Sequence, residues 1–160
     1  MKRGEKAILA LIGLVVLGGG LHSYFHAEGK HDRDIPFFST ASADVASHAT
    51  DIIRSNNCKD CHSLWTLKDV LQSVPAPMLD GIGSIRSEAW LYQYLSSPNP
   101  QAILPTRLKK QYSMPSYAKL PDSDRQILAK YLASLQVKDW YLEETKKAEY
   151  VKLTGKEPDK

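Results

Sequence analysis

Cys58-Lys59-Asp60-Cys61-His62 is the stretch of sequence that decides the fold. Its two cysteines are the only ones in the 160-residue chain, and a histidine follows the second directly. A zinc site would need two more ligands at a second close spacing, and no other cysteine is available. A thioredoxin-like dithiol would need a βαβ pattern, which the sequence lacks. A disulfide between Cys58 and Cys61 would be sterically poor.

Covalent attachment of one haem c is the chemistry that this spacing fits. Two thiols three positions apart can add to the two vinyl groups of a porphyrin, while the adjacent imidazole binds the iron. The cofactor would also supply a core. About ninety residues rich in proline bury little apolar surface relative to the entropy lost on ordering, and a flat apolar macrocycle gives them a centre. We therefore predict that Cys58, Cys61 and His62 hold one haem c.

The sixth ligand of the iron must come from elsewhere in the chain. Besides Met1 at the amino end, the methionines are Met78 and Met114. Met78 follows His62 by only sixteen residues, a span that must still wrap the histidine side of the haem, so we assign it to the core. Met114 follows His62 by fifty-two residues, and the proline after it stiffens its loop. We predict Met114 as the ligand, with His48 as its rival.

Apolar residues recur at helical spacing in three places, within residues 44–55, 87–96 and 122–135. Asp122, Ser123 and Asp124 offer cap oxygens at the start of the third helix. The sequence shows no strand alternation, and residues 63–121 contain seven of the nine prolines. We predict an all-α, cytochrome c-like domain over residues 44–137, in which three main helices and loops surround the haem. A helical tail follows over residues 138–160.

The amino end carries an apolar run. Basic residues at positions 2, 3 and 6 precede an uncharged stretch over residues 7–21, extendable to residue 25. At about 1.5 Å per residue this stretch is roughly 22 to 28 Å long, the short end of what a bilayer core requires. We predict a cytoplasmic basic stub over residues 1–6, a transmembrane signal anchor over residues 7–25 and a periplasmic tether over residues 26–43.

A cleaved signal peptide has the same basic start and apolar stretch, and it is the alternative. The small residues that cleavage needs occur at Ala41-Ser42-Ala43, about twenty residues past the apolar run and too far for normal geometry. In both cases the basic end stays inside and the rest of the chain is exported. The expected location is the inner (cytoplasmic) membrane, crossed once, with the haem domain in the periplasm.

Over its middle ninety or so residues the chain resembles a class I c-type cytochrome. The resemblance depends on an ordered set of motifs. They are Cys58-Lys59-Asp60-Cys61-His62, Pro77-Met78-Leu79, Gly81-Ile82-Gly83, Trp90 with Tyr94-Leu95, Pro98-Asn99-Pro100, Ser113-Met114-Pro115 and the stretch from Leu128 to Leu135. The family implies a small helical fold around one haem with His and Met ligands.

The same resemblance implies roles for single residues. The carbonyl of Pro77 would accept the Nδ1 proton of His62 and fix the ring, and Leu79 would pack against the haem. The family crosses its first and last helices with a small residue against an aromatic one, which here would be Ala46 or Ala49 against Tyr131. Candidates for binding the haem propionates are Arg86, Trp90, Tyr92 and Tyr112.

We predict one-electron transfer as the function of such a haem, because two axial side chains leave no coordination site on the iron for a substrate. The sequence contains no catalytic constellation, so we predict no enzyme activity of its own. The formal net charge of +3 is small and lies in residues 45–137, and it does not indicate a nucleic-acid binder. The expected partners are redox proteins and the membrane.

Two functions stay open at this point. The first is a membrane-tethered carrier that relays electrons between respiratory redox complexes. The second is a fixed haem-bearing subunit of a larger membrane or periplasmic oxidoreductase complex. Arg107, Lys109 and Lys110 are either a docking site for an acidic redox partner or a solvated loop. Trp140, Tyr141 and Tyr150 favour a stable complex through residues 138–160, and packing of this tail onto the haem domain is the alternative.

Overall fold

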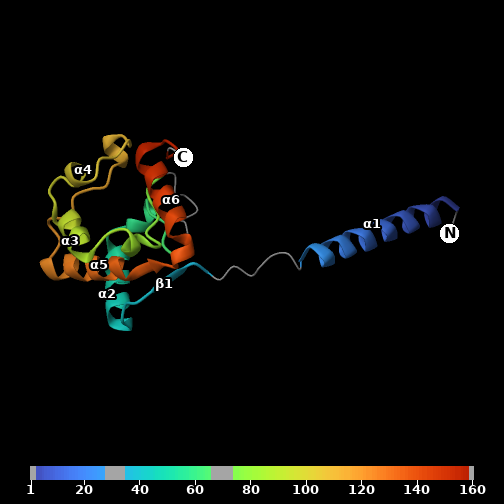
Figure 1. Cartoon of the computed structure of the whole chain (residues 1–160), viewed down its shortest axis with the longest axis horizontal. Helices are drawn as coiled ribbons and strands as arrows, with labels where there is room; N and C mark the ends of the chain where they lie inside the picture. Colours follow the sequence, from blue (N-terminus) through green and yellow to red (C-terminus); the bar gives the residue numbers. More distant parts are fainter. Residues whose placement is uncertain (1–2, 28–34, 66–73, 159–160) are drawn as a thin grey trace. The chain divides into compact units, whose positions relative to one another are not determined.

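The structure is a computed structural model, and it describes residues 3–27, 35–65 and 74–158. The chain divides into two compact units, Met1–Ile35 and Pro36–Lys160. Figure 1 shows the helices and strands of each unit.

The first unit contains the helix α1 (Arg3–Ala27). The apolar side chains described along it include Ile8, Leu11, Leu14 and Val15, which are 62 to 71 % exposed. Among the residues that the structure describes, no helix is both long and apolar enough to cross a membrane. The transmembrane helix predicted over residues 7–25 is therefore not supported by the structure.

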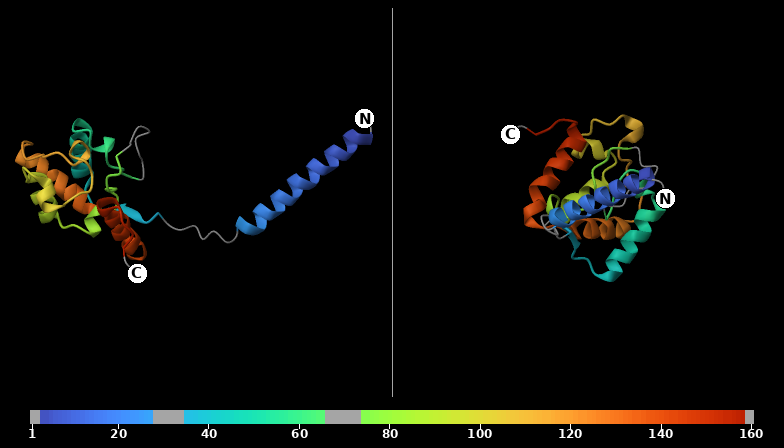
Figure 2. Two further views of the ribbon diagram at one scale, coloured as in Figure 1. Left: turned by 90° about the horizontal axis from the view of Figure 1, so that it is seen from above. Right: turned by 90° about the vertical axis from the view of Figure 1, so that its right-hand side faces the viewer.

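The second unit is built on three helices, α2 (Ala43–Ser55), α3 (Glu88–Ser96) and α5 (Asp122–Ser134). They agree to within one residue with the three helices predicted from apolar spacing. α5 packs against both α2 and α3, and α2 crosses it in Figures 1 and 2. The shared core includes Ala49, Leu91, Leu95, Leu128 and Leu132. Short helical turns connect these elements: η1 (Cys58–Asp60), η2 (Ile82–Ser84), α4 (Pro100–Ile103) and η3 (Lys110–Tyr112).

Serine caps start α2 and α3. Ser42 accepts a hydrogen bond from the backbone N–H of Val45 at 3.4 Å, and Ser87 accepts one from the backbone N–H of Trp90 at 3.2 Å. Each serine thus satisfies a first-turn donor that has no partner inside its helix.

The start of α5 differs from the prediction that Asp122, Ser123 and Asp124 cap it. The N-cap residue is Pro121, and it makes no side-chain capping bond. The carboxylate of Asp122 instead accepts hydrogen bonds from the Tyr92 hydroxyl and from Arg125 Nη2, the latter at 2.8 Å. Asp122 therefore joins α5 to α3 rather than closing its own helix.

A short sheet departs from the all-α prediction. Strand β1 (Phe37–Ser39) pairs antiparallel with β2 (Leu135–Val137), so that Phe37 lies opposite Val137. Strands of three residues are too short to show an alternation of apolar and polar residues. The pairing draws part of the predicted tether of residues 26–43 into the second unit, which begins at Pro36.

Two glycines allow η2 to lie against its neighbours. Gly81 has a φ of +81°, and a Cβ there would come within 2.3 Å of Val137 Cγ1. A Cβ on Gly83 would lie 2.0 Å from the carbonyl oxygen of Ala133 in α5. Ser84 adds a bond, since its Oγ accepts from the backbone N–H of Val137 at 2.9 Å. η2 is therefore held between α5 and β2.

The tail packs onto the rest of the second unit, which is one of the two alternatives left open by the sequence. After the turn η4 (Asp139–Tyr141) the chain forms α6 (Leu142–Thr154), as the prediction of a helical tail requires. The ring of Tyr141 meets Phe37 edge-on at 5.5 Å, and the backbone N–H of Arg107 donates to the carbonyl of Leu153 at 3.3 Å. α6 lies beside the strand pair in Figures 1 and 2. Trp140 stays 53 % exposed.

Candidate cofactor site

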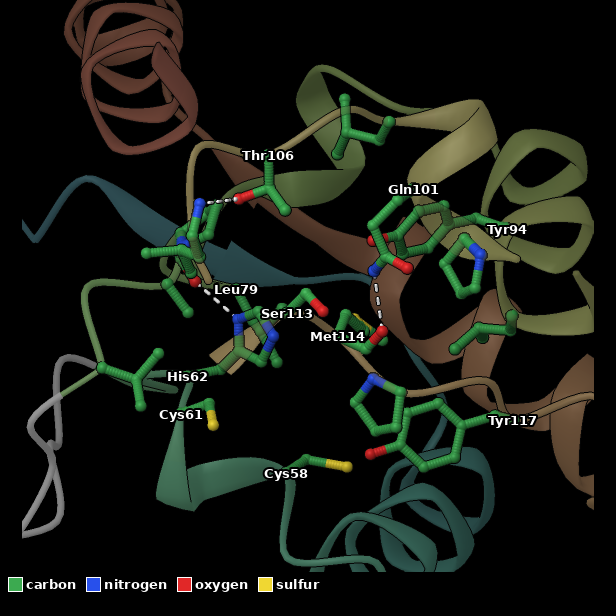
Figure 3. Close-up of a pocket in the computed structure, with 18 of the residues that line it drawn as sticks. Cys58, Cys61, His62, Leu79, Tyr94, Gln101, Thr106, Ser113, Met114 and Tyr117 are labelled. Atoms are coloured by element: carbon green, nitrogen blue, oxygen red, sulfur yellow. Dashed lines mark hydrogen bonds between the residues drawn. The ribbon is translucent and has the colours of Figure 1, made fainter. Parts of the chain in front are cut away.

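The end of α2 positions the Cys58 to His62 motif. Asn56 closes the helix, with its Nδ2 donating to the carbonyl of Ile52 at 2.9 Å. Asn57 takes the left-handed conformation at φ +52°, which asparagine adopts more readily than most residues. The turn η1 follows, and the backbone N–H of His62 donates to the carbonyl of Cys58 at 3.0 Å. Both thiols and the imidazole consequently line one cavity (Figure 3).

His62 is held in one orientation and one tautomer. Its Nδ1 lies 2.6 Å from the carbonyl oxygen of Pro77. A carbonyl oxygen can only accept, so Nδ1 carries the proton and donates it. Burial lowers the pKa of His62, which favours the neutral ring. Nε2 is then left with a free lone pair, as a metal ligand requires.

No disulfide joins Cys58 and Cys61. Burial is the main cause that raises the pKa of each, and the nearby carboxylate of Asp60 adds to it. Thiols in such surroundings are poor nucleophiles on their own, unlike those of redox-active dithiol motifs. The raised pKa values therefore do not favour a redox-active dithiol.

The cavity has a volume of about 610 Å³, which lies in the range of sites that bury a cofactor-sized ligand. Apolar and aromatic side chains form much of its wall, among them Leu79, Ile82, Leu91, Trp90 and Leu132. The wall thus offers two thiols, a fixed imidazole and a large apolar surface. This set of groups fits haem c, which needs two attachment points, an axial nitrogen and a dry pocket.

Met114 lines the same cavity as His62. Its backbone carbonyl accepts a hydrogen bond from Gln101 Nε2 at 2.7 Å, shown in Figure 3. Met78 also lines the cavity, but it follows Pro77, whose carbonyl holds His62. Met78 is therefore tied to the histidine side of the cavity. His48 is exposed on α2 and is not among the described residues of the cavity wall.

The residues predicted to surround the haem fall into two groups. Leu79, Trp90 and Tyr112 line the cavity. Arg86 and Tyr92 are not among the described residues of its wall. Tyr92 donates to Asp122, as described above, and Arg86 forms an ion pair with Glu149 at 3.0 Å. The structure thus gives Arg86 and Tyr92 protein partners, and their binding of haem propionates stays a prediction.

Sequence reasoning missed several residues of the cavity wall. Tyr94 stacks on Trp90 with ring centroids 5.1 Å apart, and burial raises its pKa. Tyr117 lies close to Cys58 in Figure 3, and burial is the main cause that raises its pKa. The helical spacing from Trp90 could have indicated Tyr94, and the position three residues after Met114 could have indicated Tyr117. Glu149 and Leu153 reach the cavity from α6, and no local pattern could have indicated them.

Two thiols, a fixed imidazole and an apolar cavity define a protein that carries covalently attached haem c. A family model for cytochrome c matches residues 47–136, more than half of the chain. The chain therefore belongs to the cytochrome c family and binds haem c, with Cys58 and Cys61 as the attachment sites. Comparisons with curated proteins and with solved structures found no match. The matched segment begins in α2 and ends in β2, so α6 lies outside it.

Proposed function

We propose that the protein is a single-haem electron carrier in which His62 and Met114 are the axial ligands. Haem c supplies one-electron oxidation and reduction when bound, and family membership supports electron transfer as the role. The observation that carries the proposal is that His62 and Met114 line one cavity. The ring of His62 is held by the Pro77 carbonyl, and the backbone carbonyl of Met114 is held by Gln101. If His62 and Met114 both bind the iron, no coordination position would remain for a substrate.

Replacing Met114 with alanine tests the ligand assignment. A thioether raises the reduction potential of a haem relative to nitrogen ligands, so the Met114→Ala holoprotein should show a lower potential. It should also bind added imidazole or carbon monoxide at the iron, which the wild type should not. Met78→Leu is the matched control, because Met78 lines the cavity but follows Pro77 on the histidine side. A Met114→Ala protein with the visible spectrum and potential of the wild type would rule Met114 out.

We propose an acidic redox partner for the basic cluster formed by Arg107, Lys109 and Lys110. All three side chains are exposed, and Lys110 also lines the cavity. Positive charge beside an electron-transfer site speeds docking of a negatively charged protein and makes it sensitive to salt. The double variant Lys109→Glu/Lys110→Glu should slow electron transfer with the partner and weaken its salt dependence. Rates in the wild type that do not change with ionic strength would contradict this role.

We propose that the N-terminal segment directs the haem domain to the periplasmic face of the inner membrane. Basic residues at positions 2, 3 and 6 precede the apolar run, which favours retention of that end in the cytoplasm. The exposed apolar side chains of α1 would be covered by lipid. Membrane fractionation and N-terminal sequencing of the mature protein test this. An intact N-terminus in the membrane fraction supports a membrane tether. A mature protein that starts near Asp44 contradicts the tether and indicates a cleaved signal peptide.

The alternative role is a fixed haem-bearing subunit of a larger oxidoreductase complex. Trp140 and Tyr150 favour it, because they remain 53 % and 43 % exposed although α6 packs onto the domain. Exposed aromatic side chains are enriched in protein interfaces. Isolation of the native protein in mild detergent separates the two roles. A stoichiometric companion identifies a subunit, whereas an isolated monomer identifies a carrier.

A further inference from the structure

An ion pair beside the cofactor cavity joins Arg86, which is in the segment matched by the family model, to Glu149, which is outside it. Arg86 Nη2 donates to Glu149 Oε2 at 3.0 Å, and the side chains are only 24 % and 12 % exposed. Glu149 belongs to α6 and lines the cavity, whereas Arg86 is not among the described residues of the wall. The group that this pair presents to the cavity is therefore a carboxylate.

Arg86 is fixed in its place behind Glu149. Its Nη1 donates to the carbonyl of Ile85 at 3.0 Å, and its guanidinium lies over the ring of Trp90 at 4.9 Å from the centroid. Its Nε is buried and has no hydrogen-bond partner among the described residues. The guanidinium is thus held by contacts on several sides and cannot swing into the cavity without breaking them. Glu149 stays next to a positive charge whose position is constant.

Glu149 is placed where its protonation responds to a nearby charge. Burial raises the pKa of its carboxyl, and the positive charge of Arg86 opposes that rise. A carboxyl with a raised pKa titrates closer to neutral pH than an exposed one. When a group of this kind lies beside a second charge-changing centre, the two titrations are coupled.

We propose that Glu149 is a redox-linked proton site of the haem pocket. On one-electron reduction of the holoprotein by a redox partner, the Glu149 carboxylate would take one proton from solvent and become a carboxylic acid. On reoxidation by an electron acceptor, Glu149 would release that proton. One positive and one negative charge enter together, so the net charge around the cavity stays constant. The inference rests on the electron-carrier function proposed above.

Other charged and titratable groups lie on the elements that pack near α6 or line the same cavity. Arg107 lies against the end of α6, where a Cβ on Gly155 would touch its side chain. Buried Asp80 precedes Gly81, where an added Cβ would lie 3.4 Å from Thr145 Cγ2. The cavity wall adds Lys110, Tyr112, Tyr94 and His62. On α6 itself the neighbours in the next turns are Lys146 and Lys152. Among the described residues, the ion pair of Glu149 is with Arg86.

The test is the reduction potential of the holoprotein measured across a range of pH. In the wild type the potential should fall with rising pH, by up to a tenfold change in the reduction equilibrium per pH unit, or about 59 mV for one electron. Glu149→Gln should remove this slope and raise the potential, because a negative charge beside the haem is lost. Glu149→Asp should keep the slope. Glu143→Gln is the matched control, since Glu143 is on the same helix but 82 % exposed.

Proton uptake gives a readout that is independent of variant folding. A weakly buffered wild-type holoprotein should take up protons on reduction, and its redox difference infrared spectrum should gain a protonated carboxyl band that Glu149→Gln lacks. A pH slope that Glu149→Gln retains, or a wild-type potential that does not change with pH, would overturn the role of Glu149 alone. A holoprotein that cannot be reduced and reoxidised reversibly would overturn the carrier function as well.

Discussion

Replacing Gly83 with alanine should strongly destabilise the haem domain, because this glycine marks a close approach between η2 and α5. The added Cβ would lie 2.0 Å from the carbonyl oxygen of Ala133 and 2.5 Å from its carbonyl carbon, whereas ordinary contacts begin at 3.4 Å. The obstacle is backbone, so no side chain can rotate away from it. η2 must retreat from α5 by roughly 1 Å or more, which a close-packed interior resists.

The size of the effect follows from this geometry. Overpacking a well-packed core typically costs about 1 to 3 kcal/mol, and an immovable backbone obstacle puts Gly83→Ala near the upper value. At roughly 4 °C per kcal/mol for a domain of this size, Tm should fall by about 12 °C. Ile82 lines the cofactor cavity beside Gly83, so the visible spectrum of the haem should change together with the stability.

Thermal unfolding of the holoprotein, followed by far-ultraviolet circular dichroism, measures the effect. Gly18→Ala in α1 is the control, because nothing lies within 4 Å of its added Cβ, and it should leave Tm of the haem domain unchanged. Gly81→Ala is a second comparison, since its obstacle is the side chain of Val137 and the further change Val137→Ala should recover part of the loss. A Gly83→Ala protein with Tm within about 3 °C of wild type would refute the reasoning.

Two further substitutions test contacts of α5. Tyr131→Phe removes the hydroxyl that accepts from Trp65 Nε1 at 3.2 Å, and it should lower the free energy of unfolding by about 1 kcal/mol in a urea titration; an unchanged midpoint would contradict this. For Asp122, the hydrogen bond from Tyr92 is the main cause that lowers the carboxyl pKa in the folded protein. The ionised carboxylate therefore stabilises the fold above about pH 4, the pKa of an unfolded aspartate, and this stabilisation is lost as the pH falls through the lowered pKa of the folded protein. Asp122→Asn should therefore lose less stability than wild type on acidification from pH 5 to pH 2, and identical Tm profiles would show that the contact contributes nothing.

Features with strong local patterns could be predicted from the sequence. The apolar spacing of α2, α3 and α5 located these helices, because each buries one face against the others. The Cys58 to His62 motif located the cofactor, because attachment chemistry demands that spacing. The bond from His62 to the Pro77 carbonyl, which the family resemblance implied, is present at 2.6 Å. It depends on a motif rather than on periodicity.

Features that depend on distant partners could not be predicted in this way. β1 and β2 have three residues each, and their pairing joins positions about a hundred residues apart. Asp122 has the side chain and position of a helix cap, but a tyrosine on α3 competes for its oxygens. Arg86 forms an ion pair with Glu149, a carboxylate 63 residues further along the chain, which no local pattern indicated. Each of these features depends on a contact with a residue far away in the sequence.

The contact between Arg86 and Glu149 also bears on how far family membership describes this protein. The family match ends at residue 136, and it contains the thiols, both proposed axial ligands and Arg86. Glu149 and Leu153 lie beyond it, yet they line the same cavity. A carboxylate in the wall of the cofactor cavity would act on the reduction potential through its charge, which is poorly screened where water is excluded. The family segment therefore contains the attachment cysteines and the proposed axial ligands, whereas the proposed proton site lies on α6.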